Sequence, residues 1–137
     1  MARRRLSHEG TLVLDSEGLS RLLADDETVV ALVAEARSRG MEVMICALTI
    51  IEAVHTRTNK ARLNWVLSGL RTVPVGDEEA KAASALLMGA GLHGHTYAID
   101  AAVAETALRQ HRPVVMLTSD IDDMTKLCGD RVRLVSV

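Results

Sequence analysis

Short apolar runs alternate with helix-like segments along the whole chain. Three of these runs, residues 11–14, 42–47 and 114–117, are apolar at nearly every position. Strands of that kind are typical of a parallel sheet that is buried on both faces, and the crossovers between parallel strands are usually helices. The alternation therefore predicts an α/β protein, a three-layer α/β/α sandwich with a central, mostly parallel sheet of about four to five strands.

Local signals place the remaining elements. Asp15 is in position to cap a helical turn near 16–23, and Asp26 and Thr28 precede an apolar i, i+3, i+4 pattern that ends near Gly40. Further helices are expected over 59–70, over 77–88 with Asp77 as the cap, over 99–109 and over 121–127, and further strands over 71–75 and 132–137.

The composition fits one compact domain. With 137 residues, 48% of them hydrophobic, the chain can bury a core, and we expect a single domain over 1–137 in which 1–9 form a flexible basic arm. There is no Phe, one Trp and one Tyr, so the core must be aliphatic and base stacking on an aromatic platform is not expected. A formal net charge of -2 gives no basic field, so a nucleic acid would need a local basic patch and bound metal.

Nothing in the sequence indicates secretion or a membrane. The two cysteines, Cys46 and Cys128, show no metal-binding spacing and no disulfide framework, which favours a reducing, cytoplasmic setting. No long apolar stretch follows Arg3, Arg4 and Arg5, so we expect neither a signal peptide nor a membrane span.

Four acidic residues stand where an apolar segment meets a turn or a helix start. They are Asp15, Glu52, Asp100 and Asp120. Because ligands of parallel α/β sheets bind beyond the carboxyl ends of the strands, we expect these side chains to converge. Crowded carboxylates repel one another and usually need a cation. The pattern therefore predicts one metal site and a metal-dependent enzyme.

Each of these acids also has a structural interpretation. Asp15 and Asp100 are in position to cap helices, although the apolar neighbours of Asp100 make an unpaired carboxylate costly there. Glu52 fits a capping box with Thr49, in which each side chain would satisfy a backbone donor at the start of a helix. Taken alone, Glu52 is better explained by this structural role.

The segment 118–123 concentrates oxygen ligands just beyond a strand. Two hydroxyls and three carboxylates come from Thr118, Ser119, Asp120, Asp122 and Asp123. A helix start capped by Asp122 or Asp123 would explain one of these carboxylates, but not all of them. An all-oxygen site favours Mg²⁺ or Mn²⁺ over Zn²⁺.

Other residues have two interpretations each. His93 and His95 lie in a Gly-rich loop, where a surface position is more common than a role in proton transfer. A basic stretch either guides phosphates towards the acids or forms a solvated helical face; its members are His55, Arg57, Lys60 and Arg62. Trp65 belongs either to the core or to a partner-binding surface. Five methionines are expected in the core: Met41, Met44, Met88, Met116 and Met124.

As an ordered set, these residues resemble the PIN-domain nucleases over nearly the whole chain, and most closely the VapC-like toxins of toxin-antitoxin pairs. The resemblance rests on four motifs: Val13-Leu14-Asp15-Ser16, Thr49-Ile50-Ile51-Glu52, residues 99–107 around Asp100, and residues 117–123 around Asp120. Each motif is weak alone, and their order is specific.

This resemblance implies a PIN-like fold and hydrolysis of RNA phosphodiester bonds by water activated on one or two Mg²⁺ or Mn²⁺ ions. It implies catalytic and metal-binding roles for Asp15, Glu52, Asp100 and Asp120. Thr118 or Ser119 would support the site, and Asp122 would be an additional ligand. The resemblance further implies a cytoplasmic homodimer and a cognate antitoxin protein that covers the site.

The chain departs from that family pattern at Glu17, which adds an acidic group after the first strand, and at Met124, where Phe is usual. Two other functions remain open. One is a catalytically silent PIN-like domain that binds RNA or protein, and the other, less favoured, is a receiver-like phosphoacceptor domain. A receiver needs a phosphorylatable Asp after its middle strand, whereas residues 42–47 lead to Leu48 and Thr49.

Overall fold

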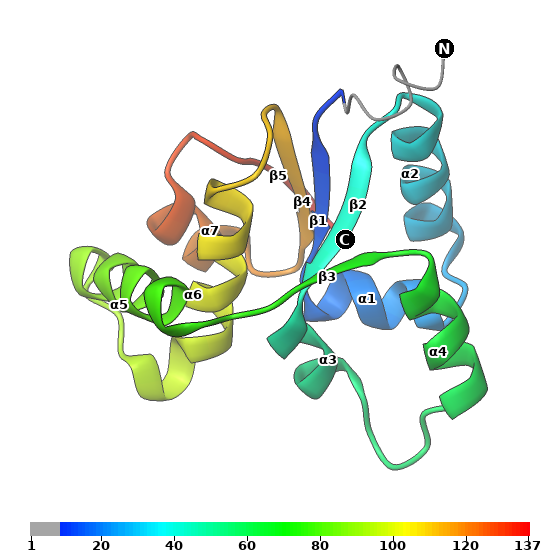
Figure 1. Cartoon of the computed structure of the whole chain (residues 1–137), viewed down its shortest axis with the longest axis horizontal. Helices are drawn as coiled ribbons and strands as arrows, with labels where there is room; N and C mark the ends of the chain where they lie inside the picture. The colour runs from blue at the N-terminus through cyan, green and yellow to red at the C-terminus, as the bar shows by residue number, and fades with distance from the viewer. Residues whose placement is uncertain (1–8) are drawn as a thin grey trace.

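A single parallel sheet organises the chain, as the computed structural model shows for residues 9–137 (Figure 1). Its five strands are β1 Thr11–Leu14, β2 Glu42–Cys46, β3 Arg71–Val73, β4 Val114–Thr118 and β5 Arg133–Ser136. They lie in the order β3-β2-β1-β4-β5, and every neighbouring pair is parallel. The predicted α/β class and central parallel sheet are therefore confirmed.

Helices cover both faces of the sheet. The seven helices of the described residues are α1 Ser16–Leu23, α2 Glu27–Ser38, α3 Ala47–Ala53, α4 Lys60–Ser68, α5 Asp77–Ala90, α6 Gly94–Leu108 and α7 Ile121–Cys128. Figure 1 shows α5, α6 and α7 on one side of the strands and α1, α2 and α4 on the other. This arrangement gives the three layers expected from the alternation of strands and helices.

The core is aliphatic and has two parts, one on each face of the sheet. Successive side chains of a strand point to opposite faces, so Val13 of β1 packs with α6 and α7 while Leu12 and Leu14 pack with α1 and α2. Three of the methionines expected in the core are fully buried: Met44, Met116 and Met124. Met88 is 81% exposed on α5, so the prediction that it fills the core is wrong.

Two predicted helix starts are wrong. Helix α3 begins at Ala47, directly after β2, so Thr49 and Glu52 lie inside the helix and form no capping box. Helix α5 is capped by Gly76, not Asp77, because the Glu79 carboxylate reaches back and accepts the Gly76 backbone N–H at 2.7 Å. The helix predicted over 99–109 agrees with the part of α6 that follows Tyr97, where the backbone is not helical; the residues of α6 before Tyr97 form an additional helical turn.

The order of the strands also excludes one of the alternative functions. A receiver-like domain has the doubly wound order 2-1-3-4-5, with the third strand in the centre of the sheet. In this chain β1 is central and β3 lies at the edge, beyond β2. The receiver-like alternative is therefore wrong.

The remaining general expectations meet the structure only in part. The predicted basic arm lies outside the described residues except for Glu9, whose backbone N–H donates to the Gly40 carbonyl at 3.1 Å. Cys46 and Cys128 are free and buried, so neither is in a disulfide. Within 9–137, no helix is long and apolar enough to cross a membrane.

Candidate active site

The candidate site lies where the chain changes direction within the sheet. From β1 the chain adds β2 and β3 on one side, and it then returns to place β4 and β5 on the other. The carboxyl ends of β1 and β4 are therefore neighbours: Leu14 pairs with Leu117, and the Asp15 N–H donates to the Leu117 carbonyl at 3.1 Å. Open α/β sheets bind ligands at this kind of switch point.

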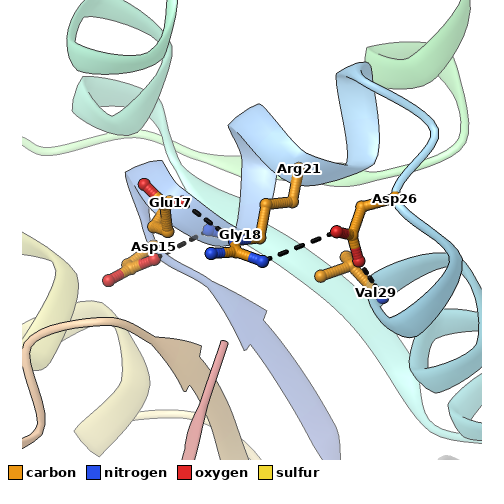
Figure 2. Close-up of polar contacts among 6 residues, drawn as sticks. All are labelled: Asp15, Glu17, Gly18, Arg21, Asp26 and Val29. Atoms are coloured by element: carbon orange, nitrogen blue, oxygen red, sulfur yellow. Dashed lines mark hydrogen bonds and ion pairs between the residues drawn. The ribbon is translucent and has the colours of Figure 1, made fainter.

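Asp15 lies at this junction, between the end of β1 and the start of α1. It caps α1, and its Oδ1 accepts the Gly18 N–H at 2.9 Å (Figure 2). Its side chain is buried, and this burial raises the pKa of the Asp15 carboxyl even though hydrogen bonds from Thr118 and Gly18 lower it. The expected capping role is confirmed, and it places the carboxylate at the site.

Gly18 allows α1 to start close against the sheet. A Cβ at this position would stand 3.3 Å from the Leu117 carbonyl oxygen and 3.3 Å from the Leu14 Cβ. That separation is tighter than ordinary van der Waals contact, so a larger residue would push α1, and Asp15 with it, away from β4. Nothing in the sequence alone signals this contact.

Thr118 connects two of the predicted acids. This residue is fully buried at the end of β4, where its hydroxyl hydrogen-bonds the Asp15 carboxylate and accepts the Asp120 backbone N–H at 2.9 Å. Of the two hydroxyls expected to support the site, Thr118 makes these contacts, whereas Ser119 is exposed and makes none that the structure describes within 9–137.

Asp100 reports the convergence of the acids most clearly. It lies on α6, half-buried, and its pKa is raised to about 6. Burial is the largest cause, followed by the negative charges of Asp120, Glu52, Asp123 and Asp15, in that order. Carboxylates from α3, α6, α7 and the end of β1 therefore share one electrostatic environment.

Asp120 occupies the N-cap position of α7 without making a capping hydrogen bond. Its exposed carboxylate is therefore available for other partners. The surrounding protein removes part of the water around this carboxylate and so raises the pKa of Asp120, and the charges of Asp123, Glu52 and Glu17 raise it further.

Asp123, rather than Asp122, belongs to this group. Asp123 affects the pKa of both Asp100 and Asp120, whereas Asp122 is exposed and contributes to neither. The reason is helical geometry: residues three apart lie on one face, so Asp123 returns to the side of Asp120 while Asp122 turns away. The structure does not bring Asp122, the predicted additional ligand, to the site.

Glu52 is exposed in the last turn of α3. It cannot be a capping residue, because that helix begins five residues earlier at Ala47. Its charge raises the pKa of both Asp100 and Asp120, so it lies near enough to the site to act on both carboxylates. The capping-box role, which explained Glu52 better from the sequence alone, is therefore wrong.

Glu17 adds a further carboxylate, and it has a cationic partner. The Arg21 guanidinium contacts the Glu17 carboxylate at 2.8 Å and the Asp26 carboxylate at 3.5 Å, which joins the start of α1 to the cap of α2 (Figure 2). Asp26 caps α2, and its carboxylate accepts the Val29 N–H at 3.0 Å. Glu17 nevertheless raises the pKa of Asp120, so it borders the acidic cluster.

These carboxylates have the donor chemistry of a site for a hard divalent cation. No positive side chain within 9–137 contributes to the shifted pKa values of Asp15, Asp100 or Asp120. Oxygen ligands without sulfur or nitrogen suit Mg²⁺ or Mn²⁺. As they lie, however, no group of three or more His, Cys, Asp or Glu side chains in the described part of the chain is arranged to hold a metal ion. The donor type fits the ion, and the ligand shell is not preformed.

The two loop histidines stay at the surface. His93 stands at the N-cap position of α6 without a capping side-chain bond, and His95 is exposed in the first turn of that helix. Neither contributes to the pKa shifts of the acidic cluster. The surface interpretation of both residues agrees with these positions.

No protein-family model matches the sequence, and no curated protein matches it. Solved structures do match. A chain of VapBC2 from Rickettsia felis, bound to a DNA fragment from its promoter, has a TM-score of 0.70 at 14% identity and covers 93% of this chain and 98% of its own. The chain shares that fold. It is the PIN-like fold expected from the sequence.

Two further structures support the same fold. A chain of a toxin-antitoxin complex from Klebsiella pneumoniae has a TM-score of 0.68 at 16% identity and covers 89% of this chain and 95% of its own. A chain of FitAcB from Neisseria gonorrhoeae has a TM-score of 0.61 at 19% identity and covers 90% of this chain and 96% of its own. The match spans nearly the full length in each case, so the PIN-like fold accounts for almost all of the chain.

Proposed function

We propose that the chain is a metal-dependent endoribonuclease that acts as the toxin of a toxin-antitoxin pair. The observation that carries the nuclease proposal is the cluster of Asp15, Glu52, Asp100 and Asp120 at the switch point of the sheet, which no positive side chain within 9–137 neutralises. Mutually repelling carboxylates destabilise the fold, so their presence favours a bound cation. The toxin half is supported by the complexes named in the matching structures.

The proposed metal ligands are Asp15, Asp100 and Asp120, with Glu52 and Asp123 at the border of the site. Thr118 holds Asp15 and Asp120 in place through its two hydrogen bonds. Bound Mg²⁺ or Mn²⁺ would supply positive charge against a phosphate oxygen and would lower the pKa of the attacking water towards neutral pH. Because Asp100 takes up a proton at about pH 6, cation binding would have to displace that proton in acidic solution.

The proposed reaction is hydrolysis. Water attacks the phosphorus of the RNA backbone, one bridging P–O bond breaks, and the departing oxygen takes a proton. The carboxylates position the reactants and compensate charge; none of them needs to form a covalent bond. The substrate is proposed to be RNA because the sequence resembles ribonuclease toxins.

We also propose a cognate antitoxin and a homodimer. A protein that places a basic side chain among these carboxylates would supply the positive charge that the acidic cluster lacks within the described residues. The antitoxin is accordingly expected to compete with the divalent cation. Co-expression with the adjacent open reading frame, followed by copurification, tests this part; an isolated chain that is harmless to cells and forms no complex would contradict it.

Cleavage of total cellular RNA by the purified chain tests the nuclease. Parallel reactions contain Mg²⁺, Mn²⁺ or a chelator, and each is repeated with Asp100→Asn and with Asp122→Asn. We expect discrete fragments that need the metal and Asp100, while Asp122→Asn cuts like the wild type because its side chain is outside the cluster. Cleavage that survives Asp100→Asn or the chelator would contradict the proposal.

A catalytically silent domain that binds RNA or protein is the second candidate. The observation in its favour is the lack of a preformed ligand shell within 9–137. The same reactions separate the two functions. Cation binding without RNA cleavage by either the free or the dimeric chain would support the silent domain.

A further inference from the structure

A hollow with a volume of about 220 Å³ lies between α1 and the segment that leads from α3 to α4. One wall is the second half of α1, including Ser20, and the other is the end of α3 and the loop that leads to α4. Figure 1 shows that this loop projects beyond the same edge of the sheet as α1 and α3. We call it the α1–α3 pocket; its polar lining residues are Ser20, His55, Arg57, Thr58, Asn59 and Arg62.

The charge of the α1–α3 pocket is opposite to that of the acidic cluster. Two arginines and one histidine line it, and none of the lining residues is Asp or Glu. The Arg57 side chain is exposed and makes no ion pair or hydrogen bond with any residue in 9–137. Arg62 is already engaged, because its guanidinium donates to the Leu22 carbonyl at 3.1 Å and the Leu23 carbonyl at 3.3 Å. Arg57 is therefore the available cation, and Arg62 is part of the wall.

The loop presents hydrogen-bond donors to the pocket. His55 Nδ1 accepts the Arg57 backbone N–H at 3.1 Å, so a neutral His55 carries its proton on Nε2 as a donor. The Thr58 hydroxyl oxygen accepts the His55 N–H at 2.9 Å, and its own hydrogen stays available. Asn59 Oδ1 accepts the Arg62 N–H at 2.9 Å, which leaves the amide NH₂ as a donor. This pattern suits an anion with several acceptor oxygens.

The pocket is also close to the acids along the chain. Ala53 lines the pocket and directly follows Glu52. Ser20 lies five residues beyond Asp15, which corresponds to roughly 7 Å along the axis of α1. An extended polyanion that reaches the acidic cluster therefore passes the pocket within about one and a half helical turns.

We propose that the α1–α3 pocket binds a backbone phosphate of the RNA substrate, next to the phosphodiester that is placed at the acidic cluster. The acids repel RNA unless a cation is bound, so the pocket supplies an attraction that does not depend on the metal. It fixes which bond of the strand lies over the carboxylates. The proposal rests on the nuclease function proposed above and adds a specificity-determining contact, Arg57.

RNA binding without metal isolates this contact. A labelled short single-stranded RNA of mixed sequence is titrated with wild-type chain in chelator, over a series of salt concentrations, and with Arg57→Gln. Arg112→Gln is the matched control, because Arg112 is exposed, makes no ion pair within 9–137 and lies at the amino end of β4, at the opposite edge of the sheet.

We expect Arg57→Gln to weaken RNA binding about tenfold and to lower the slope of log affinity against log salt by about 0.7, the value for one phosphate contact on a single strand. Arg112→Gln is expected to bind like the wild type. Equal losses in both variants, or wild-type binding by Arg57→Gln, would overturn the proposal. It would also be overturned if Arg57→Gln lost a protein partner while it kept its RNA affinity.

Cleavage separates this proposal from the nuclease proposal. If Arg57→Gln loses RNA affinity but the wild type cuts nothing with Mg²⁺ or Mn²⁺, RNA binding by the α1–α3 pocket is supported and the nuclease proposal is refuted. If Arg57→Gln binds RNA like the wild type while Asp100 is still needed for cutting, the nuclease stands and the pocket is refuted.

Discussion

The Thr118 hydroxyl hydrogen-bonds the carboxylate of Asp15 across the junction of β1 and β4. The same hydroxyl accepts the Asp120 backbone N–H at 2.9 Å. One fully buried side chain therefore fixes two acids that are far apart in the sequence. We regard Thr118 as a positioning residue of the cluster.

Thr118→Val keeps the shape of the side chain and removes both hydrogen bonds. Because it leaves the Asp120 N–H and the buried Asp15 carboxylate each short of a partner, we expect a loss of about 1–3 kcal/mol in the free energy of unfolding. Thr118→Ser keeps the hydroxyl and is expected to lose less. Urea denaturation of the three proteins measures the difference, and equal stability of the valine and wild-type chains would show that the hydroxyl does not support the acids.

The raised pKa of Asp100 makes the metal-free fold sensitive to pH. Its pKa rises from 3.8 to about 6 on folding, so between these values the folded chain binds more protons than the unfolded one. The free energy of unfolding therefore falls as the pH rises from about 4 to about 6, and this penalty stays constant above that range. Because Asp100 is only half-buried, screening by solvent limits this penalty in the free energy of unfolding to about 1–2 kcal/mol.

Asp100→Asn is expected to remove that penalty. Thermal melts in chelator, at pH 4 and pH 7, should show a variant that is more stable than the wild type at pH 7, with little difference at pH 4. The matched exposed acid, Asp122, should give no such gain when it is changed to Asn. A destabilised Asp100→Asn chain at pH 7 would indicate that Asp100 has a stabilising partner instead of repelling neighbours.

Arg21 pairs with Glu17 and so offsets the negative charge that Glu17 adds beside the acidic cluster. Arg21→Met breaks its 2.8 Å contact with Glu17 and releases a charge that faces Asp120. Both side chains are partly exposed, so we expect a small loss of stability, about 0.5 kcal/mol, that shrinks at high salt. Adding Glu17→Gln to this variant should restore part of it. A loss unchanged by salt and by the second substitution would point to packing.

Both cysteines are expected to be unreactive in the native chain. Cys46 and Cys128 are buried, and burial raises the pKa of the Cys128 thiol to about 11. A thiol reagent should label neither residue in buffer near neutral pH and both in denaturant. Rapid labelling of Cys128 in buffer would show that α7, which also carries Asp123, opens readily.

The sequence predicted the acids at strand ends because the strands themselves are easy to recognise. An apolar run stops at Asp15, and another stops just before Asp120, so both residues could be assigned to the carboxyl edge of a parallel sheet. Asp100 stood out because its neighbours are apolar. Those features depend on local residue type, which a single sequence contains.

The features that the sequence did not predict depend on the residue at which each helix begins. Glu52 looked like a capping residue because Thr49 matched a start signal, yet α3 begins directly after β2 without a capping side chain. Asp123 and Asp122 are indistinguishable until the first residue of α7 fixes which of them shares a face with Asp120. The approach of Gly18 to Leu117 depends on packing between segments that are distant in the sequence.

Binding of Mn²⁺ is the most direct test that these acids form one site. Free Mn²⁺ can be measured by electron paramagnetic resonance in titrations of the wild type and of Asp15→Asn, Asp100→Asn, Asp120→Asn and Asp122→Asn. We expect each of the first three substitutions to weaken binding of the same ion at least tenfold, while Asp122→Asn binds like the wild type. Wild-type Mn²⁺ binding by Asp15→Asn, Asp100→Asn and Asp120→Asn, each still folded, would contradict a shared metal site.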